Sequence, residues 1–520
     1  MKKTRLLLAL LLIVAIAGPL VAQGMAEPAA TGPVDIELWY GAAITEAGPP
    51  PDDWVAYDII KDKLNINLKL TALPSNEADQ DVKISAAAAA DNLPDLFMVR
   101  REVWLRLIEQ GLVATVDDLY AKMPTRTKVQ YDADSIGFTT IDGASYGLAS
   151  PGSIAKNEGV LIRKDWLDKL GLQVPKTTEE FMNVMKAFTF NDPDGNGKND
   201  TYGYGAFIEI NNNEEGLGRR LDPWFGAFGV AGTWNLTKNN FGLNVRKSAY
   251  YDAMLFIKRM IDEGVMDPNW LSYKKDDFRA AWKQGRFGIM REQNAAYAAT
   301  SNYAPFDKNF PDGEWIIVDP PKGPNGHASV GVYTQAFRIY AISDKADAVK
   351  RDAIAKLLDW MSSDEGYFLL GWGVEGVNYT LKDGIPVAEG VPDKDYAFTG
   401  PKGQPYTQLR NMVFYNGQVE LISRYPTYVT EVSKKTMSAL DVLRDMQGRA
   451  WTPNIGGDTL PPPGTDLKRF YEQGVAEFLT GKRVLNKANW DTWVAEFDKL
   501  GGKAWEDSAR VVAEQNGLLR

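Results

Sequence analysis

The chain has 520 residues, a formal net charge of −10 and no cysteine. This length favours two or more domains, and an acidic surface argues against binding to nucleic acid or to anionic membrane surfaces. The lack of cysteine excludes disulfides, thiol catalysis and a lipid-modified N-terminal cysteine.

The first 26 residues have the pattern of a secretory signal. Three basic residues within the first five positions precede an apolar run, Leu6–Ala17, and small residues follow around Gly24 and Ala26. We predict a signal peptide, residues 1–26, whose removal moves the net charge to about −13 and sends the protein to the periplasm or the medium. The alternative, a retained anchor, is weaker because the run is shorter than the ~20 residues of a membrane span, so no direct membrane insertion is expected.

Short strands then alternate with helices, which is typical of an open α/β sheet. Three such strand–helix units in succession predict a parallel sheet whose ligand edge lies at the carboxyl ends of its strands. The predicted strands are Val34–Tyr40, Ile66–Leu73 and Leu96–Val99, and the helices are Trp54–Leu64, Ser85–Ala90 and Glu102–Gln110. The C-terminal third is mainly helical, with a clear amphipathic stretch at Trp490–Leu500.

Residues 191–203, NDPDGNGKNDTYG, have the spacing of a calcium loop. Hard oxygen ligands at alternate positions suit Ca²⁺, and a glycine at position 6 allows the sharp turn. Position 12 is glycine where a full loop has glutamate, so a last ligand must come from elsewhere. The alternative is a metal-free turn rich in Asp and Asn. The predicted ligands are Asp192, Asp194, Asn196, the main-chain carbonyl of Lys198, and Asp200.

Several motifs along the chain together resemble the extracellular solute-binding proteins that deliver sugars to ABC importers, most closely their large, oligosaccharide-binding branch. Members of that branch commonly hold a structural Ca²⁺ in a DPDGNGK-type loop, usually with an acidic residue at the position of Thr201. The other matching stretches are DNLPDLFMV with GLVATVDDLY (91–120), YGLASPG (146–152), VLIRKDWLDKLGLQVPKTTEEF (160–181), residues 264–270, PPKGPNG (320–326) and GWGVEGVNYTLKDG (371–384).

The resemblance implies a two-lobed clamp that holds its ligand between the lobes and passes it to membrane permease subunits. Lobe 1 would comprise residues 34–150 and 335–380, and lobe 2 residues 151–334 and 381–520, with a helical C-terminal extension. The chain would cross near Ala149–Pro151, near Tyr333–Phe337 and after Gly373–Tyr379, where glycine and proline can absorb hinge rotation. The implied protein is a monomer and not an enzyme.

A sugar presents hydroxyls at its rim and an apolar C–H face, so its site needs aromatic plates and planar polar groups. Strand alternation points Trp39 and Tyr40 to opposite faces, and we expect Tyr40 to face the ligand. Trp224 is expected in a glycine-rich loop that leaves its ring partly exposed. The resemblance places the ligand-binding groups at Tyr40, Arg100, Arg101 and Glu102 in lobe 1, at Trp224, Arg291, Gln293 and Asn294 in lobe 2, and at Trp372 and Glu375 beside the hinge.

The two arginines at 100 and 101 can instead form surface ion pairs. Together with Arg291 they would suit an acidic sugar, but three cations do not decide it. An exported glycoside hydrolase or polysaccharide lyase is an alternative, since a hydrolase needs only two carboxylates. A catalytic triad would have to use the single histidine, His327. A peptide receptor on the same clamp is a third interpretation.

Overall fold

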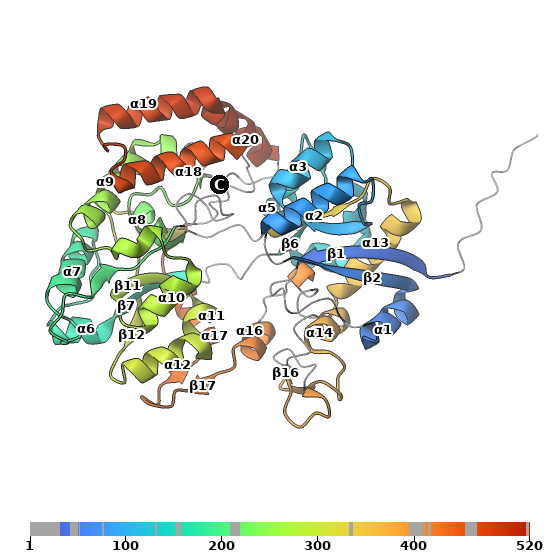
Figure 1. Ribbon diagram of the computed structural model, residues 1–520, viewed down its shortest axis with the longest axis horizontal. Helices are drawn as coiled ribbons and strands as arrows, with labels where there is room; N and C mark the ends of the chain where they lie inside the picture. The colour runs from blue at the N-terminus through green and yellow to red at the C-terminus, as the bar shows by residue number, and fades with distance from the viewer. Residues whose placement is uncertain are drawn as a thin grey trace, which may run out of the picture.

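A computed structural model gives the fold, with two lobes that lie side by side (Figure 1). Each lobe is built around one main β-sheet. Within the described part of the chain, no helix is long and apolar enough to cross a membrane. The structure describes residues 32–41, 50, 52–74, 77–130, 133–151, 158–208, 219–331, 336–394, 409, 411–413, 418–452, 465–515 and 519.

Lobe 1 contains a five-stranded sheet in the order β2-β1-β3-β14-β6. Strand β1 pairs in parallel with β2 and β3, which confirms the predicted parallel arrangement of the first three strands. Strand β14 is inserted antiparallel between β3 and β6. The bounds are β1 (Val34–Gly41), β2 (Ile66–Leu73), β3 (Leu96–Val99), β6 (Leu148–Pro151) and β14 (Ala336–Ile342).

Helices lie on both sides of this sheet in Figure 1, with α2 and α3 on one side and α1 and α14 on the other. Helix α1 ends where Asn65 adopts a left-handed conformation (φ 58°), a residue type that tolerates this region well. The predicted helices are confirmed to within about a turn, except that α2 begins earlier. The bounds are α1 (Val55–Leu64), α2 (Glu77–Ala89), α3 (Arg101–Glu109), α4 (Pro124–Gln130), α5 (Ala133–Phe138), α13 (Ala348–Met361) and α14 (Asp364–Trp372), with a 3₁₀ turn η2 (Asp117–Lys122).

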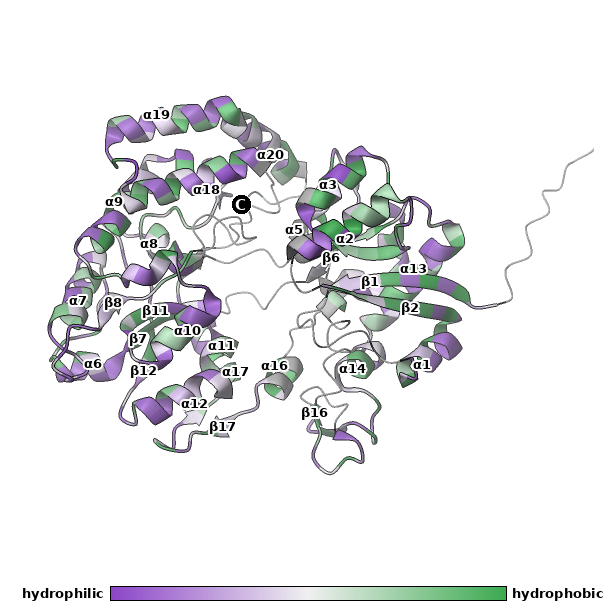
Figure 2. Cartoon of the chain, in the orientation of Figure 1, coloured by the Kyte–Doolittle hydropathy of each residue, from purple (hydrophilic) through white to green (hydrophobic). Residues whose placement is uncertain are grey.

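Lobe 2 contains a four-stranded mixed sheet in the order β12-β7-β11-β8. Strand β7 runs antiparallel to both β11 and β12, and β8 runs parallel to β11. Apolar residues fill the middle of β7 and the first half of β11, whereas outer helices such as α19 mix green with purple in Figure 2. The bounds are β7 (Glu158–Arg163), β8 (Tyr202–Tyr204), β11 (Phe287–Gln293) and β12 (Trp315–Val318).

Two hydrophobic clusters pack against the lobe 2 sheet, one of which extends into the C-terminal helices α18 to α20. Trp490 and Trp493 are buried there, as expected of the amphipathic stretch. The helices are α6 (Lys164–Lys169), α7 (Thr178–Phe190), α8 (Asp222–Ala227), α9 (Ser248–Asp262), α10 (Lys275–Lys283), α11 (Asn294–Ala298), α12 (Thr300–Asn309), α16 (Gln418–Arg424), α17 (Ala439–Gln447), α18 (Thr465–Thr480), α19 (Lys487–Phe497) and α20 (Lys503–Gln515).

Short strand pairs complete the fold. Strand β13 pairs in parallel with β19 within lobe 2, and the other pairs are antiparallel. The bounds are β4 (Thr140–Ile141), β5 (Ala144–Ser145), β9 (Trp234–Asn235), β10 (Gly242–Leu243), β13 (Val330–Gly331), β15 (Thr380–Lys382), β16 (Ile385–Val387), β17 (Tyr428–Val429), β18 (Thr436–Met437) and β19 (Trp451–Thr452).

The chain passes between the lobes from the ends of these strands. One passage separates β6 from β7, and a second separates β13 from β14. The third lies later than the resemblance implied, because Leu409, Met412 and Val413 still pack in the lobe 1 core whereas Leu421 packs in lobe 2. Leu409, Met412 and Val413, which were assigned to lobe 2, therefore pack with lobe 1.

The cap of α7 gives a test of local stability. Thr177 accepts a hydrogen bond from the Glu180 amide at 3.2 Å, and the Glu180 carboxylate accepts one from the Thr177 amide at 3.2 Å. We expect Thr177→Ala to lower the free energy of unfolding by ~1 kcal/mol, measured by urea denaturation. Thr492→Ala, on the exposed face of α19, is the matched control and should change the free energy of unfolding little. Equal losses of stability in the two variants would contradict the capping role.

Candidate functional site

Strand registers bring the predicted site segments to the edges from which the chain crosses. In lobe 1 the end of β6 pairs with the start of β14, and β14 lies beside the carboxyl end of β3. In lobe 2 the first residue of β7, Glu158, pairs with the last residue of β11, Gln293. Because the passage from β6 to β7 joins these two edges, we define the carboxyl ends of β1 and β3 and the paired ends of β7 and β11 as the candidate site.

At the end of β1 the structure reverses the expected orientation of two aromatic residues. Tyr40 is fully buried in the lobe 1 core, whereas Trp39 is half-buried. The Trp39 indole N–H donates to Glu37 Oε1 at 3.0 Å, and the Lys83 ammonium lies 4.8 Å from the ring centroid. The prediction that Tyr40 faces the ligand is wrong for this conformation. Asp35, Glu37 and Trp39 occupy alternate positions and therefore lie on the same face of β1. The two charged residues identify this face as the outer one.

The two arginines after β3 hold neighbouring helices. Arg100 Nη1 lies 3.3 Å from Asp81 Oδ2 of α2. Arg101 Nη1 donates to the Phe138 carbonyl at 2.7 Å, and its guanidinium lies over the rings of Trp104 and Phe138. Both are partly buried at the lobe 1 edge. Their contact with a ligand remains a prediction, as does that of Glu102, whose side chain lies outside the described part of the structure.

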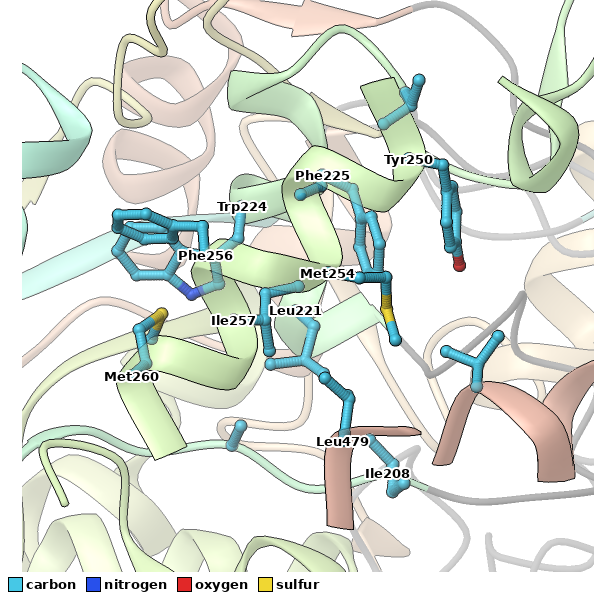
Figure 3. Close-up of a cluster of buried hydrophobic side chains, with 14 of the residues drawn as sticks. Ile208, Leu221, Trp224, Phe225, Tyr250, Met254, Phe256, Ile257, Met260 and Leu479 are labelled. Carbon is cyan, nitrogen blue, oxygen red and sulfur yellow. The ribbon is translucent and has the colours of Figure 1, made fainter. Parts of the chain in front are cut away.

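Trp224 lies in helix α8 and not in a loop. Its side chain is 1 % exposed, and Figure 3 shows the ring beside Phe256 and Met260. It makes edge-on contacts with Phe181 and Tyr204 at centroid distances of 5.8 and 5.1 Å. The expected exposure of the ring is therefore wrong, because the surrounding glycines and proline belong to a buried helix packed against α9.

Arg291 belongs to a buried network of three arginines and three carboxylates at the lobe 2 edge. Its guanidinium lies 3.2 Å from both Glu158 and Asp222, and its side chain is 0 % exposed. A ligand cannot reach it in this conformation. The prediction that Arg291 meets the ligand directly is thus not supported by its position, which instead joins the first residue of β7 to α8.

The other half of this network surrounds Glu292. Arg220 lies 2.9 Å and Arg279 3.1 Å from its two carboxylate oxygens. Burial alone would raise the pKa of Glu292, but the two guanidinium groups lower it below its ordinary value. The charges balance, as buried charges must if they are to remain ionised.

The two polar residues after Glu292 differ in exposure. Gln293 is partly exposed, and its amide nitrogen donates to Glu158 Oε1 at 3.2 Å. Asn294 is buried, and its amide nitrogen donates to the Ala439 carbonyl at 3.0 Å, which links α11 to α17. Gln293 thus lies where it can meet a ligand at the lobe 2 edge, whereas Asn294 fastens two helices.

Trp372 and Glu375, predicted beside the hinge, have different surroundings. Trp372 is buried among the rings of Tyr367 and Phe368, and its indole N–H donates to Ser423 Oγ at 2.7 Å. Glu375 is exposed. Burial, with a smaller effect of the Glu375 charge, raises the pKa of Tyr379 to about 12.

In the predicted calcium loop the carboxylates accept hydrogen bonds from the loop itself. The Asp192 oxygens accept from the amides of Asn196 and Gly197, both at 3.0 Å. The Asn196 side-chain nitrogen donates to Asp194 Oδ2 at 2.8 Å and Asp200 Oδ1 at 3.1 Å. Across the described residues, no group of three or more His, Cys, Asp or Glu side chains is arranged to hold a metal ion. The oxygen donors suit Ca²⁺ chemically, but they are arranged as in an Asx-rich turn.

A cavity of about 520 Å³ lies away from these edges, between the end of α1, η2 and α13. Lys122 pairs there with Asp352 at 2.6 Å, and Lys356 donates to the Leu64 carbonyl at 3.0 Å. Its polar groups are thus engaged with one another, and the strand edges remain the candidate site.

Comparison with known proteins identifies the family. The model of the bacterial extracellular solute-binding proteins matches residues 24–367. The chain is 28 % identical over 523 residues to the polygalacturonan/rhamnogalacturonan-binding protein YtcQ of Bacillus subtilis (strain 168), covering 96 % of this chain and 97 % of YtcQ. The chain therefore belongs to the bacterial extracellular solute-binding protein family, which consists of binding proteins and not of enzymes.

Two solved structures show the same two-lobed fold. The alginate-binding protein AlgQ2, determined without calcium ion, matches with a TM-score of 0.66 and 16 % identity over 93 % of this chain and 98 % of AlgQ2. An EF-hand mutant of the S. pneumoniae substrate-binding protein FusA, in complex with fructo-nystose, matches with a TM-score of 0.62 and 18 % identity over 94 % of this chain and 100 % of FusA. The predicted fold class is confirmed.

The burial of Trp224 predicts a stability defect. We expect Trp224→Ala to lower the free energy of unfolding by ~3 to 5 kcal/mol, because it removes a ring from a packed core. Thermal and urea unfolding measure the loss. Trp39→Ala is the matched control and should cost less, since its ring is half-buried; a Trp224→Ala protein as stable as the parent would contradict the core assignment.

The Glu292 network predicts a pH-dependent stability. Glu292→Gln should cost ~3 to 5 kcal/mol near neutral pH, because it leaves Arg220 and Arg279 uncompensated. Since the folded pKa lies below the ordinary 4.5, the contribution is fully present above that value. It is lost as pH falls through the folded pKa.

Urea unfolding of parent and Glu292→Gln from pH 7 to pH 3 tests this, with the exposed Glu179→Gln as the control. The difference between parent and Glu292→Gln should shrink on acidification. A difference that is constant with pH would show that the charge of Glu292 does not stabilise the fold.

Proposed function

We propose that this protein is the exported ligand-capturing component of an ABC importer, and that it binds an oligosaccharide between its lobes and delivers it to permease subunits. The observation that carries the proposal is the similarity to YtcQ over nearly the whole of both chains. The FusA and AlgQ2 structures, named for carbohydrate ligands, support it through the fold. The proposed protein acts as a monomer after removal of residues 1–26, which lie outside the described part of the chain.

The candidate site contains groups suited to a sugar. Trp39 offers a partly exposed aromatic ring beside the Lys83 ammonium at the lobe 1 edge. Gln293 offers a planar amide at the lobe 2 edge. An aromatic plate on one lobe and a planar polar group on the other are the elements that a sugar site needs, and contacts from both sides would favour the closed clamp.

Acidic oligosaccharides are the first class to test. YtcQ is named for galacturonan polymers, and Lys83, Arg100 and Arg101 lie at the lobe 1 edge. Because Arg291 is neutralised within lobe 2, attraction of a uronate carboxylate falls to the lobe 1 cations. A neutral oligosaccharide is the comparison.

No catalysis is proposed. The buried carboxylates of Glu158, Asp222 and Glu292 are each paired with an arginine, which favours a structural role over that of a hydrolase acid and base. A clamp that holds its ligand for delivery does not need to stabilise a transition state.

We also propose that the loop of Asp192, Asp194, Asn196, the Lys198 carbonyl and Asp200 holds a structural Ca²⁺. Burial and the neighbouring carboxylates of Asp192 and Asp200 raise the pKa of Asp194, a crowding of like charge that a cation would relieve. A half-turn of the Asn196 side-chain amide exchanges its oxygen and nitrogen, and this would present the oxygen to the cation. The ion would stabilise the fold away from the ligand.

Binding can be tested by thermal shift. An oligogalacturonide bound by the folded clamp should raise the melting temperature in proportion to ln(1 + [L]/Kd), and chromatography should return the sugar intact. Trp39→Ala should weaken binding by ~1 to 3 kcal/mol through loss of stacking.

Trp360→Ala is the matched control, since this partly buried tryptophan lines the lobe 1 cavity away from the strand edges; it should bind like the parent. No shift with acidic or neutral oligosaccharides would contradict the proposed ligand class. A cleavage product that depends on a carboxylate pair would assign the protein to the hydrolases.

Calcium can be tested independently of the sugar. Chelation should lower the melting temperature of the parent, and Asp194→Ala should abolish that sensitivity because it removes a proposed ligand. Asp168→Ala, on the exposed face of α6, should remain sensitive. If chelator has no effect and elemental analysis detects no calcium, the loop is only a turn.

A further inference from the structure

Helix α16 (Gln418–Arg424) lies between the two lobes in Figure 1. It follows the last residues that pack in the lobe 1 core, Met412 and Val413, and it precedes α17 in lobe 2. It contacts α17 on one side and β16 on the other. A single helix of two turns thus touches both bodies that must move relative to one another when the clamp closes.

One contact fixes α16 to lobe 2. Leu421 is 5 % exposed and belongs to the same hydrophobic cluster as Leu443 of α17 and Met290 of β11. Movement of Leu421 away from this cluster would expose apolar surface to water, which is unfavourable. The helix is therefore expected to move with lobe 2.

A second contact fixes the same helix to lobe 1. Ser423 Oγ accepts a hydrogen bond from Trp372 Nε1 at 2.7 Å and donates one to the Pro386 carbonyl at 3.1 Å. Trp372 ends α14 and packs against Tyr367 and Phe368 in the lobe 1 core. Ser423 is thus held between a buried ring of lobe 1 and strand β16, which follows that ring in the chain.

The two contacts are only two residues apart on one helix, so they cannot separate without unwinding it. A rotation of one lobe against the other must either pivot about this point or break the hydrogen bonds of Ser423. We propose that Ser423 is a positioning residue for clamp closure, and that its bond to Trp372 makes α16 the pivot that sets the angle between the lobes.

This proposal assigns Trp372 a role that does not require contact with a ligand. The indole N–H bond of a buried tryptophan has a fixed direction, because packing holds the ring. It therefore restricts the directions in which α16 can tilt. Loss of the bond should widen the range of lobe angles and change the balance of open and closed states.

The absence of native cysteine allows a clean measurement of lobe angle. Cysteines at Val82 in α2 and Val511 in α20, which are 68 % and 52 % exposed, place one spin label on each lobe. Double electron–electron resonance on the ligand-free protein then gives the distribution of interlobe distances. We expect Ser423→Ala and Trp372→Phe each to shift or broaden this distribution relative to the labelled parent.

The double variant tests whether one bond is responsible. If Ser423 and Trp372 act through their shared hydrogen bond, Ser423→Ala/Trp372→Phe should shift the distribution no further than the larger single change. Ser438→Ala is the matched control, since Ser438 caps α17 within lobe 2; it should leave the distribution unchanged.

Three outcomes would overturn the proposal: parent-like distributions in both single variants, a shift in one of them alone, or an equal shift in Ser438→Ala. Thermal unfolding of each labelled protein confirms that it is folded. Because no sugar is added, the result stands apart from the proposed function: failure to bind an oligosaccharide would leave the pivot intact, and failure of the pivot would leave the ligand class intact.

Discussion

Strand β14 occupies a central position in the lobe 1 sheet, and the rest of the architecture depends on that placement. Without it, β3 and β6 would each present an unpaired edge. The chain therefore has to leave lobe 1 after β6, build much of lobe 2, and return to supply β14 antiparallel to both neighbours. This return places the end of β6 and the start of β14 at one edge of the lobe 1 sheet, and that edge is where the carboxyl ends of β1 and β3 lie.

Buried charge limits what lobe 2 can offer at its edge. Arg291 and Glu158 join the end of β11 to the start of β7, and Arg220 and Arg279 neutralise Glu292 beside them. Removal of one partner would leave an uncompensated charge in the core. These residues therefore stay paired with one another and hold the ends of β7 and β11 together. In the proposed function, recognition of a ligand by lobe 2 then falls to side chains that project beyond the network, such as Gln293, while lobe 1 supplies the partly exposed ring of Trp39.

The sequence predicted the framework well, because strands β1 to β3 and their helices follow from local hydrophobic patterns. It also placed the site segments at strand ends, which the register confirms. It failed where burial depends on the partner surface: glycine and proline around Trp224 suggested a loop, but α9 and α7 supply a core that encloses the ring. For Tyr40 and Trp39 the correct orientation could have been predicted, because the charged residues Asp35 and Glu37 lie on the same face of the strand as Trp39. The antiparallel insertion of β14 was not predictable locally, because its partners lie far away in sequence.

The late third passage changes how closure can occur. Leu409, Met412 and Val413 still pack in the lobe 1 core, and α16 then carries Leu421 in the lobe 2 core and Ser423 against Trp372. Because α16 is held to both lobes, a rotation of one lobe is passed to the other through the helix. With α16 as the pivot, a ligand that closes the clamp rotates the lobes about a defined point.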